Sequence, residues 1–97
     1  MPVYVYSPEK NFKLIQERNI SFEEIIAAIE NDQILSIEDH SNQKKYGHQK
    51  IYVICVKDYV YLVPFVIETN GCIFLKTIIP SRKAKQKYFP GELNEKK

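Results

Sequence analysis

The spacing of the apolar residues changes near Gln33, and this change constrains the fold more than any other feature of the sequence. Before Gln33, one group of apolar residues recurs at the i, i+3, i+4, i+7 spacing of an amphipathic helix: Phe22, Ile25, Ile26 and Ile29. After Gln33, apolar residues alternate with polar ones or form continuous runs, which is typical of β-strands. Helices followed by consecutive strands predict an α+β fold.

Two helices are expected before this change. Ser7 is suited to cap the first, because its hydroxyl can accept from unpaired N–H groups and the Pro and Glu that follow fit a first turn. This helix should end at Asn19, and its apolar stripe consists of Phe12, Ile15 and Leu14. Ser21 and Glu24 form the capping box of the second helix, which should end near residues 31–32.

Four main strands and a short N-terminal one are expected, over residues 34–39, 50–56, 59–67 and 72–79 and over residues 3–6. Lys57-Asp58 is a tight turn, and Asn70-Gly71 is the strongest turn signal in the chain, typical of a type I′ hairpin. Residues 40–47 are polar and predict a loop. Because short hairpins join the strands, the sheet should be largely antiparallel.

The last strand leads into a basic segment. Pro80 should end the pairing because it has no N–H to donate, and Ser81 should cap a short helix that runs to about Tyr88. Residues 90–97 resemble a frayed tail. The 97 residues are too few for two domains, so we expect one domain over residues 1–97. In it, two N-terminal helices pack on one face of a four-stranded, largely antiparallel sheet, a basic helix follows, and the other face is available for binding.

The charges are divided unevenly along the chain. Residues 1–39 hold three cations and eight acids, whereas residues 40–97 hold eleven cations and four acids. Between Pro80 and Tyr88 there are four cations and no acid: Arg82, Lys83, Lys85 and Lys87. This division favours two faces with different tasks, the basic one binding an anion. The simpler interpretation is a solvated basic helix.

The composition excludes several classes of protein. With 44% hydrophobic and 27% charged residues, the chain is typical of a globular rather than a disordered protein. Its two cysteines, Cys55 and Cys72, have neither metal-ligand nor redox spacing, so we expect no metal and no cofactor. No apolar run approaches the ~20 residues that span a bilayer. The first residues do not resemble a signal peptide, and these features together predict a cytoplasmic protein without a membrane partner.

Several segments resemble one family. The helix start Pro8-Glu9-Lys10, the second start at residues 20–24 and the basic end at residues 78–84 are similar to the BrnT-like branch of the RelE/ParE superfamily of bacterial toxins. Residues 59–65 followed by 74–84 are similar to a related set of small toxin-like proteins. The resemblance implies a RelE-like fold and a ribonuclease toxin that cuts messenger RNA, free or on the ribosome, and is inhibited by a cognate antitoxin. Other branches of the superfamily act on DNA gyrase.

Metal-independent RNA cleavage needs groups that transfer protons and fixed positive charges that stabilise the phosphate. The candidate catalytic residues are His40, Tyr46, Lys50 and Arg82. The candidate RNA contacts are Lys44, Lys45, Lys76, Lys83, Lys85, Lys87 and Tyr88. Each has a simpler interpretation: His40 as a loop histidine that bonds its own backbone, Arg82 as a surface ion pair, and Tyr88 as packing for the last helix.

Two other functions remain open at this point. The same basic surface could bind nucleic acid or an acidic partner without catalysis, which would give salt-sensitive binding and no cleavage product. The chain could also be a degenerate toxin that only pairs with an antitoxin. An antitoxin would cover the sheet's open face and place acids against the lysines.

Overall fold

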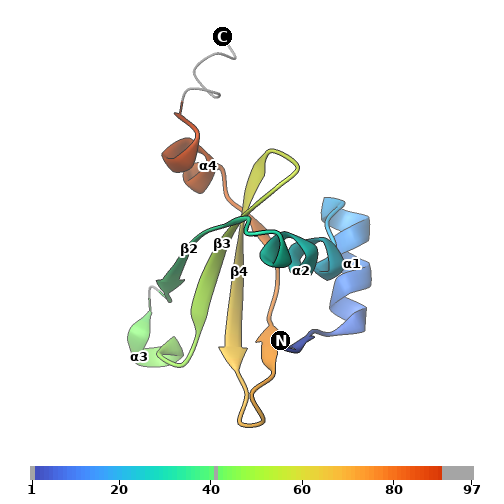
Figure 1. Ribbon diagram of the computed structural model, residues 1–97, viewed down its shortest axis with the longest axis vertical. Helices are drawn as coiled ribbons and strands as arrows, with labels where there is room; N and C mark the ends of the chain where they lie inside the picture. Colours follow the sequence, from blue (N-terminus) through green and yellow to red (C-terminus); the bar gives the residue numbers. More distant parts are fainter. Residues whose placement is uncertain (1, 41, 91–97) are drawn as a thin grey trace.

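The computed structural model of the chain describes residues 2–40 and 42–90, and it confirms an α+β fold (Figure 1). The helices are α1 (Pro8–Arg18), α2 (Phe22–Glu30), α3 (Gln43–Tyr46) and α4 (Arg82–Tyr88). The strands are β1 (Tyr4–Val5), β2 (Ile34–Asp39), β3 (Lys50–Val56), β4 (Tyr59–Ile67), β5 (Ile73–Leu75) and β6 (Ile79–Pro80). The segment expected to be a loop contains α3, and the expected tail beyond residue 90 lies outside the described residues.

The sheet has six strands in the order β1-β5-β4-β3-β2, with β6 also paired to β4, because the short N-terminal strand joins the sheet and the expected fourth main strand forms two strands. It is mixed rather than antiparallel throughout, because β1 pairs with β5 in parallel. The expected last strand is split into β5 and β6. The physical reason lies at Ile78, which is completely buried and whose carbonyl accepts from Arg18 Nη1 at 2.7 Å. That carbonyl therefore bonds to α1 at the point where the strand is interrupted.

Both N-terminal helices begin where the sequence predicts. The Ser7 hydroxyl accepts from the Lys10 N–H at 3.2 Å, and α1 ends at Asn19, which has the left-handed φ of 56°. Ser21 and Glu24 form both hydrogen bonds of a capping box at the start of α2. These local signals were readable because capping depends on residues only a few positions apart.

The buried face of α1 differs from the expected one. Leu14 is buried, but Phe12 is 62% exposed and Ile15 is 45% exposed, so the predicted stripe was wrong at two of its three residues. Asn11 is buried instead. Its Oδ1 accepts from the Phe22 N–H at 2.7 Å and its Nδ2 donates to a Glu23 carboxylate oxygen at 2.9 Å. The bonds of this amide to the first turn of α2 hold α1 in its observed rotation.

The type I′ geometry expected at Asn70-Gly71 occurs instead at the other hairpin, where only a tight turn was expected. Lys57 and Asp58 have φ values of 53° and 64°, so this turn has the two positive φ values of a type I′ hairpin. At the other hairpin only Gly71 has a positive φ, at 90°, and its N–H donates to the Glu68 carbonyl at 2.8 Å. Hairpins with a three-residue connection commonly place a glycine with positive φ at the last position of that connection. Its φ lies in the region that favours glycine.

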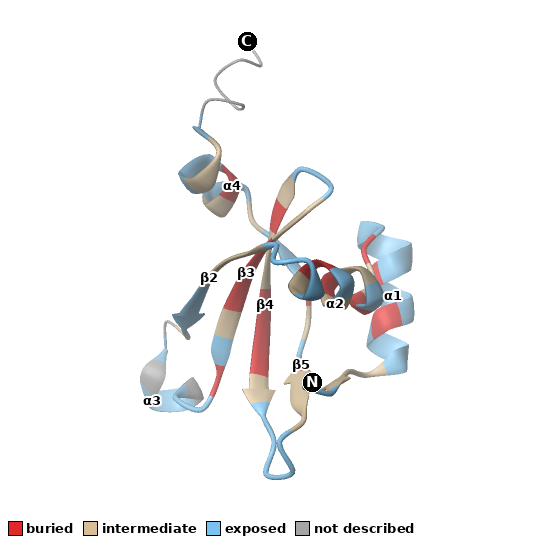
Figure 2. Cartoon of the chain, viewed as in Figure 1, coloured by how far each residue is buried: buried red, intermediate tan, exposed pale blue. Residues whose placement is uncertain are grey.

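The core lies between the N-terminal helices and one face of the sheet (Figure 2). Register places Tyr52 opposite Val63 and Leu75 opposite Phe65, and all four side chains belong to this core. The alternate residues of the same strands point to the second face. There Val53 is buried although it lies outside the helix-side cluster, and it lines a groove with residues of α4.

Candidate functional site

α4 crosses one end of the second sheet face and is held at both of its ends. At its start, the Ser81 hydroxyl accepts from the Ala84 N–H at 3.1 Å, and the Ser81 N–H donates to the Val60 carbonyl of β4 at 2.9 Å. At its end, the Tyr88 hydroxyl donates to Ser36 Oγ of β2 at 2.9 Å. α4 therefore extends from β4 to β2, and Tyr88 packs the last helix on the sheet, as its simpler interpretation predicted.

Lys85 has a structural position. It is only 7% exposed, its ammonium donates to the Asp58 carbonyl, and it lies 5.9 Å from the centroid of the Tyr59 ring and 5.4 Å from that of Phe89. A buried ammonium with these partners is not available to an RNA phosphate, so we withdraw Lys85 from the predicted RNA contacts. It instead attaches α4 to the turn between β3 and β4.

Lys85→Met is expected to lower the free energy of unfolding by about 1.5 kcal/mol, because it keeps the apolar stem but removes a charged hydrogen bond. Urea denaturation measures this change. The matched control is Lys83→Met on the same helix, where the side chain is exposed and the change should stay within about 0.5 kcal/mol. Equal destabilisation by the two substitutions would contradict the anchoring role of Lys85.

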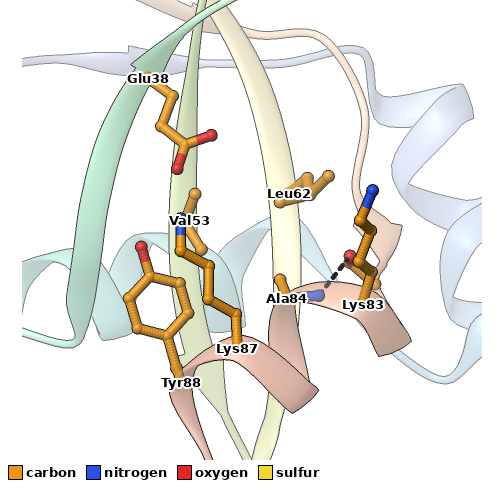
Figure 3. Close-up of a pocket in the computed structure, with 8 residues that line it drawn as sticks. Glu38, Val53, Leu62, Lys83, Ala84, Lys87 and Tyr88 are labelled. Carbon is orange, nitrogen blue, oxygen red and sulfur yellow. Dashed lines mark hydrogen bonds between the residues drawn. The ribbon is translucent and has the colours of Figure 1, made fainter.

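A groove of about 450 Å³ lies between α4 and the second sheet face (Figure 3). Its lining residues come from three strands and the helix: Glu38, Val53, Leu62, Ser81, Lys83, Ala84, Lys87 and Tyr88. Figure 3 shows the Glu38 carboxylate directed toward the side of the groove that holds Lys87 and Tyr88. Among the described residues, no ion pair involves Glu38, Lys83 or Lys87. The groove thus combines an apolar floor with one carboxylate and two ammonium groups.

Two hydrogen bonds connect the exposed Glu38 carboxylate to Ser36 and Tyr88. Ser36 Oγ donates to Glu38 Oε2 at 3.2 Å, and Ser36 Oγ in turn accepts from the Tyr88 hydroxyl at 2.9 Å. Because a carboxylate can accept several bonds, this arrangement leaves further lone pairs for a ligand. Sequence reasoning missed Glu38, although one signal was present. Ser36 and Glu38 are two residues apart in the strand expected over residues 34–39, a spacing that places both side chains on one face.

The predicted catalytic residues are not brought together. His40 lies just after β2, and its Nδ1 accepts from the Asn42 N–H at 3.1 Å, as the simpler interpretation proposed. Lys50 forms a 2.7 Å ion pair with Asp39. Arg82 is exposed on α4, next to Ser81. The side chain of Tyr46 lies outside the described part of the chain.

Strand register shows how far apart these residues lie. Ser81 bonds to Val60, which is opposite Cys55, and Cys55 is five residues along β3 from Lys50. At about 3.4 Å per residue, roughly 17 Å separates Lys50 from the start of α4. His40 and Lys50 are therefore at one end of the sheet, and Arg82 is at the other.

The remaining predicted RNA contacts divide into two groups. Lys44 and Lys45 are exposed on α3, beside His40 and Lys50. Lys76 is exposed after β5, with its Nζ 5.6 Å from the centroid of Phe74. Register places Phe74 opposite Val66, so Phe74 and Lys76 lie on the second face of the sheet. Lys83 and Lys87 are the members that line the groove.

The strand tyrosines are structural. Tyr52 is 6% exposed and stacks on Phe65 with ring centroids 4.0 Å apart, and its burial raises the pKa of the phenol to about 12. Burial also raises the pKa of Tyr61. A phenol with a raised pKa is a weak acid at neutral pH, so these residues are poorly suited to proton transfer. Tyr52 thus belongs to the helix-side core, and Tyr61 packs against it.

Comparisons with known proteins identify no family: no family model matches the chain, and neither a curated protein nor a solved structure shows significant similarity to it. Within the described residues, no helix has the length and apolar character to cross a bilayer. The same part of the chain contains no group of three or more His, Cys, Asp or Glu side chains arranged to hold a metal ion.

Proposed function

We propose that the chain is a metal-independent endoribonuclease and the toxin of a bacterial toxin–antitoxin pair, with its active site in the groove under α4. The toxin assignment depends on the sequence resemblance to BrnT-like proteins and the RelE-like arrangement it implies. The assignment of the site depends on one observation of the structure. A carboxylate held by a hydrogen-bond chain, Glu38, shares a groove with Lys83 and Lys87.

These residues match the requirements of the reaction. Glu38 accepts the proton of the ribose 2′-hydroxyl, and the 2′-oxygen attacks the adjacent phosphorus. The bond from phosphorus to the 5′-oxygen breaks, which leaves a 2′,3′-cyclic phosphate and a 5′-hydroxyl. Lys83 stabilises charge on the non-bridging oxygens, and Lys87 supplies the proton of the leaving 5′-oxygen. The apolar floor of Val53 and Leu62 accommodates the ribose and base.

The other predicted residues take supporting roles in this proposal. Arg82, next to Lys83 at the start of α4, contacts a neighbouring phosphate through its planar fork. Lys44, Lys45 and Lys76 attract the RNA backbone by charge from positions outside the groove. The protein acts in the cytoplasm. Its antitoxin covers the second sheet face with an acidic segment that pairs with the lysines of α4.

The proposal predicts RNA cleavage in the presence of excess EDTA. Purified protein incubated with a 5′-labelled single-stranded RNA should yield fragments that end in a 2′,3′-cyclic phosphate, as identified by mass spectrometry. Added Mg²⁺ should not accelerate the reaction, because the lysines supply the positive charge. Cleavage that stops in EDTA and returns with Mg²⁺ would refute the mechanism.

A non-catalytic binding module is the second candidate. One observation favours it: His40 and Lys50, two of the proton-transfer candidates, are engaged with Asn42 and Asp39. In that case RNA would bind in a salt-sensitive way and remain intact in every buffer. The cleavage assay therefore separates the two functions.

A further inference from the structure

A second cluster of positive charge lies on α1, outside the groove. The acidic half of the chain, residues 1–39, contains only three cations, and all three line one cleft of about 210 Å³: Lys10, Lys13 and Arg18. Leu14, Glu17 and Thr77 complete its lining. The helical residues follow an i, i+3, i+4, i+7, i+8 spacing, so one side of α1 supplies them all. The fold adds Thr77, which lies far along the sequence, to these residues of α1.

The cations of this cleft have no acidic partner. Among the described residues, neither Lys10, Lys13 nor Arg18 forms an ion pair, although Glu17 lies in the same cleft. Arg18 donates one N–H to the Ile78 carbonyl at 2.7 Å, which orients its guanidinium beside Thr77 and leaves other N–H donors of the fork. Three cations against one carboxylate give the cleft a net positive charge.

The cleft lies close to the groove in the fold. Leu62 of the groove floor is opposite Ile79 of β6, and the preceding residue, Ile78, provides the carbonyl that Arg18 binds. Neighbouring strands lie about 4.8 Å apart, so the Arg18 guanidinium is within roughly 10 Å of the strand that forms the floor. Because the cleft and the groove lie on opposite faces of the sheet, a single RNA strand that occupies both has to pass around β6, which pairs with β4.

We propose that this cleft binds a phosphate group of single-stranded RNA that extends out of the groove. A phosphodiester offers several oxygens, which suit the fork of Arg18, the two ammonium groups and the Thr77 hydroxyl together. The choice of RNA as the source of the phosphate rests on the proposed function. A free phosphate ion has the same chemistry and is the other source to be distinguished.

RNA binding by Glu38→Gln protein, which should cleave the probe only slowly, tests the cleft in the full chain. Fluorescence anisotropy is measured with a labelled trinucleotide and a labelled twelve-nucleotide RNA over a range of salt concentrations. Lys10→Gln with Lys13→Gln should weaken binding of the long RNA several-fold and reduce its salt slope by about 1.4, the value for two lost phosphate contacts on a single strand. Binding of the trinucleotide should not change.

Three further variants separate the site from general charge. Lys57→Gln removes one exposed cation at the turn between β3 and β4, and Lys13→Gln removes one from the cleft. Arg18→Lys keeps the positive charge but loses the planar fork of the guanidinium, so it should also weaken binding of the long RNA. An effect of Lys57→Gln equal to that of Lys13→Gln, or a long-RNA affinity unchanged in the double variant, would overturn the proposal. RNA cleavage by the wild type would still support the groove as the active site.

Inorganic phosphate distinguishes the two sources. In a nuclear magnetic resonance titration, phosphate should shift the amide signals of Arg18 and Thr77 in the wild type and not in the Lys10→Gln, Lys13→Gln double variant. These shifts in a protein that binds no RNA would assign the cleft to free phosphate and overturn its role in RNA binding, together with the proposed function. No shift with phosphate and no loss of RNA affinity in the double variant would reject the cleft as a site of either kind.

Discussion

Replacement of Glu38 by Gln is expected to slow RNA cleavage by about 10²- to 10⁴-fold, the usual contribution of a general base, without weakening RNA binding. Glutamine keeps the size of the side chain and can still accept from Ser36, so the groove should retain its shape. What is lost is the ability to take the 2′-hydroxyl proton. Single-turnover cleavage of a labelled RNA, with binding measured separately by anisotropy, separates these effects.

The neighbouring residue provides the matched control. Asp39 follows Glu38 on β2, points to the opposite face of the sheet and pairs with the exposed Lys50. Asp39→Asn makes the same chemical change one residue away, and it should leave cleavage nearly unaltered because exposed ion pairs contribute about 0–1 kcal/mol. Full activity in Glu38→Gln, or an equal loss in Asp39→Asn, would show that the groove carboxylate is not the base.

Ser36→Ala tests the hydrogen-bond chain itself. The substitution removes the donor to Glu38 and the acceptor of Tyr88, and it should reduce the cleavage rate less than loss of the carboxylate does. A positioning residue of this kind changes the geometry of the base but not its identity. Single-turnover cleavage by Ser36→Ala and Glu38→Gln, measured side by side, should therefore show the larger loss in Glu38→Gln.

The sequence identified one half of the candidate site and missed the other. The basic helix was predicted with its cap and its end, because Ser81 and the cations after it are local signals. Glu38 was treated only as the end of a strand. Its importance depends on the Tyr88 hydroxyl, which is 52 residues from Ser36 in sequence and 2.9 Å from it in the fold. No pattern within a short window contains that information.

The same distinction applies to the fold. The bounds of β2, β3 and β4 and the starts of α1, α2 and α4 follow from alternation, capping and turns, and all were predicted. The parallel pairing of β1 with β5 joins residues about 70 positions apart, for example Tyr4 and Ile73, so no local pattern indicates it. The break between β5 and β6 likewise depends on a distant residue, because Arg18 of α1 donates a hydrogen bond to the Ile78 carbonyl.

The division of charge along the sequence has a spatial counterpart. The two helices from the acidic half cover one face of the sheet, and the basic α4 crosses the other. Anion binding by the basic face stays a prediction, and the cations of α1 show that the other face is not uniformly acidic. The sequence did not indicate that Lys85 is buried where α4 contacts the sheet. On a short helix with four cations, no pattern shows which side of the helix packs against the sheet.

Phe22→Ala is expected to lower the free energy of unfolding by about 3–5 kcal/mol, the usual range for a fully buried phenylalanine. Phe22 is completely buried and stacks on Tyr6 with ring centroids 4.8 Å apart, so alanine would leave a cavity between α2 and the N-terminal segment. Because small domains are stable by only about 5–15 kcal/mol, the loss should be evident in urea or thermal denaturation.

Phe12→Ala is the control, and its result also bears on the phosphate cleft. Phe12 is 62% exposed, and alanine favours helix, so stability should change by no more than about 0.5 kcal/mol. The apolar spacing of the sequence predicts the opposite, a large loss at both phenylalanines. A large loss at Phe12 would mean that α1 is rotated away from the observed position. That rotation would also remove Lys10 and Lys13 from beside Thr77, so the stability of this one variant tests the cleft without any RNA.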